Sequence, residues 1–297
     1  MNSSVKFSSL HTHSIFCDGS DGIETLCKTA YEKGLCAIGF SSHGPITKKT
    51  GFKTEWHIAD SRLDEYIGEV RAAKKRWEGK IAVFLGLEID YIKGLCSAAD
   101  KDVRSLDLDY IIGSVHYIIP ENGAAPFTVD GSLEEVQTGI NEAFKGDINA
   151  FIDAYWTSMA EMLDLGGFDI LGHADLLKKN NKNYCLFNPE SRAYADNIEK
   201  ICAAISNNDC AVECNTGGIT RKKIQETYPS LPFLRCLKKY NVPVIITADA
   251  HKAQDLDGNY DIAAHTLSQA GYGEHALFEG RAGGKAMWGR GKVMNNE

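Results

Sequence analysis

The sequence predicts an α/β protein in which parallel strands close into a barrel. Seven short apolar runs alternate with stretches of helical periodicity, an alternation that is typical of a parallel sheet. In most runs the apolar residues come first and a histidine, glutamate or aspartate comes at the end. The carboxyl ends of the strands form the active site of a (β/α) barrel, so this order favours a barrel. A chain of 297 residues with seven strands is long enough for a closed or nearly closed one.

The predicted strands are rich in β-branched and aromatic residues. In chain order they are VKFSSLHTH (5–13), CAIGFSSH (36–43), IAVFLGLEID (81–90), LDYIIGSVH (108–116), FDILGHAD (168–175), CAVECNT (210–216) and VPVIITADAH (242–251). The run HALFEG, near Ala276, is a weaker candidate for an eighth strand.

Amphipathic helices are predicted between these strands. The first covers residues 23–33 and follows Ser20 and Asp21, which are expected to cap it. The others cover residues 63–77, 148–165, 189–206, 231–240 and 260–270. The longest irregular region, 120–131, directly follows His116, and its glycine and proline content suits a loop at the mouth of the site.

The charge and the hydropathy pattern exclude several classes of partner. The net charge of -8 at pH 7 argues against a general nucleic-acid or anionic-membrane surface, because these partners need a basic patch. No apolar stretch approaches the roughly 20 residues that cross a bilayer, and the polar start MNSSVKFSS lacks the apolar region of a secretory signal. We therefore expect a cytoplasmic protein. The sequence leaves its oligomeric state open.

The nine cysteines form no CxxC framework and are expected to be mostly buried thiols. Cys17 lies beside the first histidine pair but is not expected to bind metal.

Two pairs of polar residues, at opposite ends of the sequence, have the spacing of metal ligands. Residues two apart on an extended strand point to one face, so His11 and His13 aim at one point, and Asp249 and His251 do the same.

Nine imidazole or carboxylate groups are candidate metal ligands: His11, His13, Asp18, His43, Glu88, His116, His173, Asp249 and His251. Nine groups are too many for one ion that also keeps water, so two or three divalent ions are expected. Mixed histidine and carboxylate ligation suits Zn, Mn or Fe rather than Ca or Mg. Glu88 is the best candidate to bridge two ions, because a charge inside an apolar strand needs cations nearby.

Ions roughly 3.5–4 Å apart can share a hydroxide and clamp the oxygens of a phosphoryl group during in-line attack. Hydrolysis of a phosphate ester is therefore the predicted reaction. The leaving alkoxide needs an acid or a metal to help it, and the predicted acid is a group near Asp249 or His251. A lone histidine is more often structural than a ligand, so His57, His265 and His275 are expected not to bind metal.

Taken together, these motifs resemble the PHP (polymerase and histidinol phosphatase) family, whose signature is HxH, a later His, a Glu, a further His and a terminal DxH. The resemblance runs through HTHSIFCDG, FSSHGP, GLEIDYI, DYIIGSVHYI, FDILGHADLLKK, VECNTGG and TADAH. It implies a distorted (β/α)7 TIM-like barrel, one domain over residues 1–297, and a three-metal centre. The stand-alone histidinol-phosphate phosphatases are the most similar branch, so the implied reaction is hydrolysis of L-histidinol phosphate to L-histidinol and phosphate, in histidine biosynthesis.

The resemblance also implies how the ligands are shared. One ion would take His11, His13, Glu88 and Asp249, a second would share Glu88 and add His116 and His173, and a third would take Asp18, His43 and His251. The substrate phosphate would be met by basic side chains from two loops, which here are Lys178 or Lys179 and Arg221 or its neighbours Lys222 and Lys223.

Two features of the sequence depart from the family pattern. Ser42 stands where the family commonly has an aspartate before the ligand His43, so a carboxylate that would orient this ligand is missing. The stretch NTGGITRKK differs from the usual shorter spacing between NT and the arginine, which leaves the phosphate-binding cation open by a position or two.

Glu213 and Asn215 share a strand face and are expected to point into the barrel. Asn215 is interpreted as a donor to a ligand or to substrate. Glu213 either orients a ligand, pairs with a neighbouring cation, or contacts the cationic part of an amino-alcohol phosphate, for which Glu55, Asp90 and Glu121 are equally available. Two other functions stay open: a phosphoesterase for nucleotides, oligonucleotide ends or sugar phosphates, and a catalytically silent metal-binding module.

Overall fold

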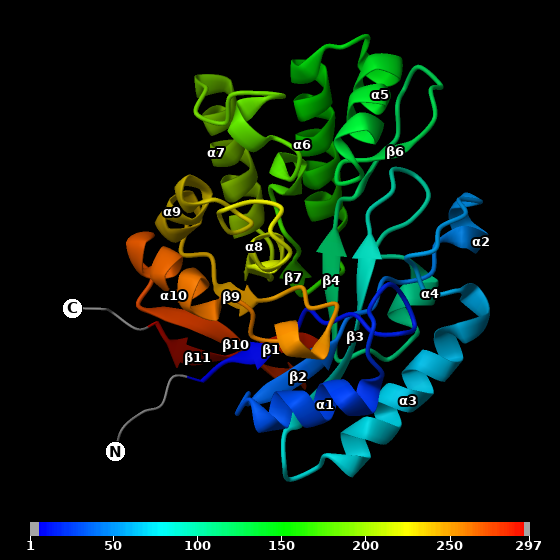
Figure 1. Ribbon diagram of the computed structural model, residues 1–297, viewed down its shortest axis with the longest axis vertical. Coiled ribbons are helices and arrows are strands. Elements are labelled where there is room, and N and C mark those ends of the chain that lie inside the picture. Colours follow the sequence, from blue (N-terminus) through cyan, green and yellow to red (C-terminus); the bar gives the residue numbers. More distant parts are fainter. Residues whose placement is uncertain (1–5, 294–297) are drawn as a thin grey trace.

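The computed structural model describes residues 6–293, and a seven-stranded parallel sheet forms their centre (Figure 1). Its strands neighbour one another in the order β1 (Ser8–Ser9), β2 (Ala37–Phe40), β3 (Ala82–Asp90), β4 (Tyr110–Ser114), β7 (Ile170–Leu171), β8 (Ala211–Asn215) and β9 (Val244–Thr247). Every pairing between neighbours is parallel. The seven predicted strands are therefore confirmed, apart from Val5, which lies outside the described residues.

The sheet closes into a barrel through the residues that follow β1 and β9. Thr12 and Ala250 form a parallel bridge. The backbone N–H of His13 donates to the carbonyl oxygen of Ala250 at 2.8 Å, and the N–H of Ala250 donates to His11 at 3.0 Å. Because this closure lies at the carboxyl ends of the strands, it brings the two predicted ligand pairs side by side.

The six predicted helices are also confirmed, with small differences at their ends. They are α1 (Ile23–Glu32), α3 (Leu63–Arg76), α6 (Ile148–Leu165), α7 (Arg192–Ser206), α9 (Leu231–Lys239) and α10 (Tyr260–Gln269), and Figure 1 shows them around the sheet. The structure adds α5 (Leu133–Phe144) and the single turns α2 (Thr47–Thr50), α4 (Lys101–Arg104) and α8 (Gly217–Thr220). None of the helices in residues 6–293 has both the length and the apolarity that a membrane crossing requires.

The predicted caps of α1 are wrong. Gly22 is the N-cap residue, and no side chain caps the helix. Asp21 instead accepts a hydrogen bond from the backbone N–H of Ala253 at 2.9 Å, and the Ser20 hydroxyl donates to the carbonyl oxygen of His251 at 3.2 Å. These two side chains therefore join the loop after His13 to the loop after β9.

The predicted eighth strand forms but does not join the barrel. It is β10 (Glu274–Ala282), which pairs antiparallel with β11 (Lys285–Lys292) in a separate two-stranded sheet. Phe278 of this hairpin packs edge-on against Phe84, with ring centroids 4.9 Å apart, and lies 5.5 Å from Tyr110. The hairpin thus covers the end of the barrel opposite the predicted ligands through apolar contacts.

The inside of the barrel is filled by a large side chain placed against glycines. The hydroxyl of Tyr110 donates to the carbonyl oxygen of Leu10. A Cβ atom on Gly39 or on Gly86 would lie 2.6 Å from atoms of this tyrosine, so both strands need glycine to let the ring pass. The predicted loop 120–131 also contains β6 (Phe127–Thr128), which pairs with β5 (Tyr117–Ile118) beside the site.

Candidate metal centre

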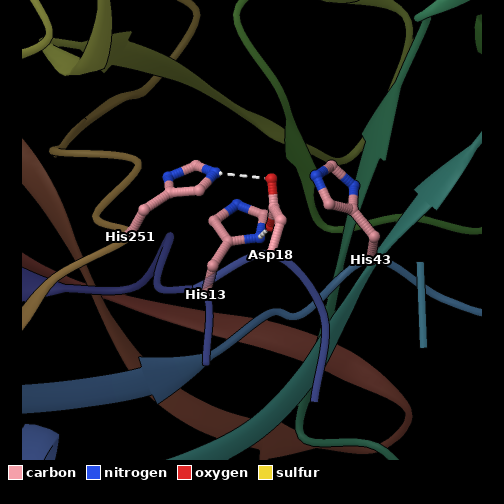
Figure 2. A group of neighbouring side chains, drawn as sticks. All are labelled: His13, Asp18, His43 and His251. Carbon is pink, nitrogen blue, oxygen red and sulfur yellow. Dashed lines mark hydrogen bonds and ion pairs between the residues drawn. The ribbon is translucent and has the colours of Figure 1, made fainter. Parts of the chain in front are cut away.

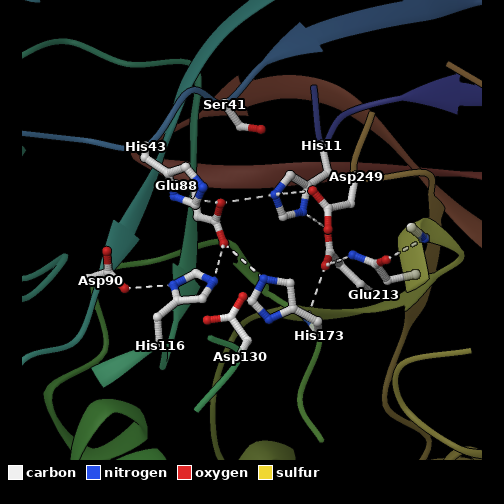
Figure 3. A network of polar contacts seen from close by, with 12 residues as sticks. His11, Ser41, His43, Glu88, Asp90, His116, Asp130, His173, Glu213 and Asp249 are labelled. Atoms are coloured by element: carbon white, nitrogen blue, oxygen red, sulfur yellow. Dashed lines mark hydrogen bonds and ion pairs between the residues drawn. The ribbon is translucent and has the colours of Figure 1, made fainter. Parts of the chain in front are cut away.

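The nine predicted ligands lie together at the carboxyl ends of the strands (Figures 2 and 3). Glu88 belongs to β3, and the others follow strands or, for Asp18, come from the loop after His13. Residue groups that could hold an ion draw on all nine, and their ligand atoms lie within 4.8 Å of one another in each group. The barrel therefore brings together side chains that are up to 240 positions apart, from His11 to His251.

Glu88 is the centre of this arrangement. Its carboxylate is 1% exposed and faces five imidazoles, of which Figure 3 labels His11, His43, His116 and His173. The distances to its oxygens are 3.1 Å from His11 Nε2, 3.6 Å from His13 Nε2, 3.1 Å from His43 Nδ1, 3.6 Å from His116 Nε2 and 2.9 Å from His173 Nε2. One carboxylate among five imidazoles can bridge two cations, as the sequence predicts for this residue.

Asp249 provides a second buried carboxylate. Its Oδ1 lies 3.2 Å from His13 Nε2 and 3.7 Å from His11 Nε2. The residue has φ of +48°, in the left-handed region, where aspartate is tolerated better than most side chains. This backbone turn after β9 aims the carboxylate at the histidines of the neighbouring segment that follows β1.

A third cluster, drawn in Figure 2, contains the two more exposed ligands, Asp18 and His251. Asp18 contacts His251 Nε2 at 3.0 Å and His13 Nδ1 at 3.4 Å. His43 completes this group. The resemblance assigned Asp18, His43 and His251 to a third ion, and the geometry brings His13 to the same group. Because residue 42 is serine, no aspartate precedes His43 in sequence, and the His43 ring packs edge-on against Trp56 at 4.7 Å.

The orientation of the buried nitrogens fits divalent cations. His13 Nε2 and His43 Nδ1 are buried and make no hydrogen bond, although each lies within 3.6 Å of a carboxylate oxygen. Nitrogens and carboxylate oxygens that aim at a shared space rather than at one another are arranged as ligands of a cation. The described residues thus offer sites for divalent metal ions.

The electrostatics of the cluster agree with this. Burial alone would raise the pKa of Glu88, but His43 and His11 hold it well below its usual value. Burial lowers the pKa of His43 to about 3, so its ring is neutral and can donate a lone pair. Against the effect of burial, Asp90 and Glu88 raise the pKa of His116 to about 10. A bound cation would replace the proton on such a histidine, because histidine binds metal as the neutral imidazole.

Glu213 orients ligands rather than lining the cavity. It is fully buried, its Oε1 lies 2.6 Å from His11 Nδ1, and its Oε2 accepts from the backbone N–H of His173 at 3.0 Å. Asn215, also buried, donates to the same carboxylate at 3.0 Å. Of the roles left open for Glu213, the geometry favours fixing the ring of His11, since metal-binding histidines commonly donate their second nitrogen to a carboxylate.

Asp90 has a similar role that the sequence did not reveal. Its Oδ1 lies 2.6 Å from His116 Nδ1. It stands two positions after Glu88 on the same strand face, and that spacing is the signal that could have identified it. His57, expected to be structural, joins Asp90 and His43 in a buried group, whereas His265 and His275 lie outside every such group in the described residues.

A cavity of about 470 Å³ opens above the cluster. The residues that line it include Asp18, His43, Glu88, His116, His173, Asp249 and His251, together with Trp56, Thr128, Asp130, Gly131, Glu135, Leu176, Lys179, Gly218, Arg221, Lys223 and Tyr228. One predicted ligand pair, Asp249 and His251, thus meets three of the phosphate-binding candidates, Lys179, Arg221 and Lys223, at this cavity. A divalent centre at its floor and cations on its wall suit an anionic substrate.

Of the basic side chains predicted to bind phosphate, some line the cavity and others do not. Lys179 lines the cavity and donates to Asp130 at 2.9 Å. Lys178 does not line it; its side chain is 5% exposed and pairs with Asp175 at 3.0 Å and Glu226 at 2.6 Å. The turn α8 brings Arg221 to the cavity, where its Nη2 donates to Asp249 Oδ2 at 2.7 Å. Lys223 also lines the cavity, whereas Lys222 does not.

Comparison with known proteins agrees with this architecture. Residues 9–217 match the PHP domain family. A Deinococcus radiodurans protein assigned as a histidinol phosphatase is 27% identical over 262 residues, which cover 88% of this chain and 92% of that protein.

Two solved structures have the same fold. A Listeria monocytogenes protein assigned as a histidinol phosphatase has a TM-score of 0.75 at 22% identity, over 85% of this chain and 98% of that one. The histidinol phosphate phosphatase of Lactococcus lactis, solved with zinc, L-histidinol and phosphate, has a TM-score of 0.67 at 20% identity, over 96% of this chain and 100% of that one.

Proposed function

The chain belongs to the PHP family, and on that premise we propose that it is a metal-dependent phosphomonoesterase that hydrolyses L-histidinol phosphate to L-histidinol and phosphate in histidine biosynthesis. The observation that carries the proposal is the position of Glu88, which faces five imidazoles at the floor of a cavity that also presents Arg221 and Lys179. Relatives named for the same reaction, one of them solved with L-histidinol and phosphate, support the choice of substrate.

The proposed cofactors are two or three divalent ions, Zn, Mn or Fe. We assign His11, His13, Glu88 and Asp249 to the first, Glu88, His116 and His173 to the second, and Asp18, His43 and His251 to the third. When bound, such ions supply Lewis acidity and lower the pKa of water. The proposed domain is residues 1–297, because Asp249 and His251 follow β9, beyond the end of the family match at residue 217.

The protein groups have separate roles in this proposal. Lys179 and Arg221 neutralise the charge of the phosphate, since both lie on the wall of the cavity. Burial would raise the pKa of Asp249, but Arg221 and His11 hold it well below its usual value, so this carboxyl is a poor proton donor. Of the two residues predicted to protonate the leaving alkoxide, this leaves His251, whose side chain is 22% exposed. His251 would donate a proton only while it is not a ligand of the third ion, because a ligand imidazole is neutral.

The proposed contacts of the alcohol part also lie in the cavity. L-Histidinol phosphate carries an ammonium and an imidazole, and Asp130 and Glu135 line the wall. Glu55 and Glu121 do not line it, and Asp90 is buried in hydrogen bonds to two histidines. Trp56, on the same wall, offers an aromatic surface to the ring.

The test is phosphate release by the purified protein with Mn or Zn supplied. L-Histidinol phosphate is compared with nucleoside monophosphates, oligonucleotides with terminal phosphates and sugar phosphates. A kcat/KM for L-histidinol phosphate at least tenfold above the rest is expected. Equal rates throughout would reject the substrate but keep the phosphoesterase, and no turnover of any ester would favour a silent metal-binding module.

A further inference from the structure

A buried chain of hydrogen bonds leads from the loop before α3 to the metal centre. Thr54 Oγ1 lies 2.6 Å from His57 Nδ1, and His57 Nε2 lies 2.7 Å from Asp90 Oδ2. The other oxygen of Asp90 lies 2.6 Å from His116 Nδ1, a contact that Figure 3 shows. Residues from two segments of the chain are thus joined to one predicted ligand, His116.

The partners fix where the protons are. An ionised carboxylate only accepts hydrogen bonds, so His57 donates from Nε2 and His116 donates from Nδ1 to Asp90. His57 Nδ1 then accepts from the Thr54 hydroxyl, and His116 Nε2 faces Glu88 at 3.6 Å. A single assignment of protons therefore satisfies every hydrogen bond from Thr54 to His116.

We propose that Asp90 and His57 are positioning residues, which hold the ring of His116 so that its Nε2 presents a lone pair to a divalent cation beside Glu88. This inference rests on the metal centre of the proposed function. His57, Asp90 and His116 are 6%, 1% and 4% exposed, so no water competes for the bonds that orient the ring. Carboxylates that orient metal-binding histidines in this way raise their basicity as ligands.

His57 acts on Asp90 rather than on a cation of its own. It could form a metal group with His43 and Asp90. However, both oxygens of Asp90 and both nitrogens of His57 already have partners in the chain, which leaves no lone pair of either imidazole nitrogen for an ion. Without His57, one oxygen of Asp90 would be buried without a donor, and the carboxylate would be free to rotate away from His116.

The experiment measures metal binding without substrate. Mn²⁺ affinity is determined by competition with a chelator, and bound metal by elemental analysis, for wild type, Asp90→Asn, His57→Leu and His57→Gln. The Mn²⁺ dissociation constant of the weakest-held ion should rise about 10–100-fold in Asp90→Asn. It should rise less in His57→Leu and return toward wild type in His57→Gln, because the amide N–H can still donate to Asp90.

Asp169→Asn is the matched control. Asp169 is also a buried carboxylate, but it lies at the opposite end of the barrel, where it accepts from Arg281 and from the backbone N–H of Ile111. This variant should lower the melting temperature without changing Mn²⁺ affinity. Circular dichroism tests whether each variant folds. If Asp90→Asn does not fold, the two His57 variants test the proposal by themselves.

Unchanged Mn²⁺ affinity in Asp90→Asn would overturn the proposal. So would equal effects of His57→Leu and His57→Gln, because rescue by a retained donor separates positioning from packing. Loss of one whole equivalent of metal in both His57 variants would make His57 a ligand instead. Since no substrate is present, failure to hydrolyse L-histidinol phosphate would leave these results unaffected.

Discussion

Glu213 Oε1 lies 2.6 Å from His11 Nδ1, so a carboxylate in β8 orients a predicted ligand that follows β1. The two residues are 202 positions apart and both are fully buried. The pKa of His11 is raised well above its usual value, because Glu213 and Glu88 outweigh the effect of burial. The contact makes His11 more basic and fixes its ring, so the metal centre depends on a residue that does not face the cavity.

Replacing Glu213 by glutamine should weaken the metal centre. The variant keeps the size of the side chain but loses the charge that orients His11, and kcat and Mn²⁺ affinity should each fall about 10–100-fold. Steady-state kinetics at saturating Mn²⁺ should show little change in KM. A rise in KM alone, with unchanged metal affinity, would instead support the contact with a cationic substrate group.

Removal of metal should lower both activity and stability. A ligand at 100 times its dissociation constant stabilises the folded state by about 2.7 kcal/mol. Chelator treatment should therefore abolish phosphate release and lower the melting temperature, and Mn²⁺ or Zn²⁺ should restore both. In Glu88→Gln, added metal should raise the melting temperature much less and should not restore turnover. A full response of this variant would contradict the central position of Glu88.

Lys179 and Lys178 should differ although they are neighbours in sequence. Lys179 lines the cavity, so Lys179→Ala should lower kcat/KM about 10–100-fold, as expected for one lost hydrogen bond to a charged group. Lys178 is buried against Asp175, so Lys178→Met should cost about 3–5 kcal/mol of stability. Kinetics and urea unfolding of both variants are the check, and the reverse pattern would place Lys178 at the phosphate.

The capping box of α5 should contribute stability that depends on pH. Ser132 accepts from the backbone N–H of Glu135 and donates its own N–H to the Glu135 carboxylate at 2.6 Å. These bonds lower the pKa of Glu135 below its ordinary value of 4.5. Because the folded-state pKa is depressed, the contribution is present above pH 4.5 and is lost as the pH falls through the folded-state value.

Urea unfolding of wild type and Glu135→Gln at pH 7 and pH 3 measures this effect. The wild type should be the more stable protein at pH 7, and the difference should shrink at pH 3. Ser132→Ala should cost about 1 kcal/mol at pH 7. An equal difference at both pH values would show that the charge of Glu135 does not matter.

The seven strands and most helices could be predicted because each is defined by residues close in sequence. The helix α5 was missed although Ser132 and Glu135 have the spacing of a capping box. The convergence of the nine polar residues could also be predicted, since a barrel brings the carboxyl ends of its strands together. The predicted caps of α1 were wrong because a distant partner decided them: Ala253 bonds Asp21. The sequence did not show where the weaker strand candidate β10 would pack, which is on Phe84 through Phe278.

The sequence by itself determined the order of strands and helices, the side chains at the strand ends and the chemistry they can support. Only the tertiary structure decided which of them touch. It turned Lys179 toward the cavity and Lys178 away from it, bonded Glu213 to His11, and joined His57 to His116 through Asp90. The physical reason is the separation along the sequence over which each interaction acts. Periodicity and capping act over a few residues, whereas these hydrogen bonds join side chains that only the closed barrel brings together.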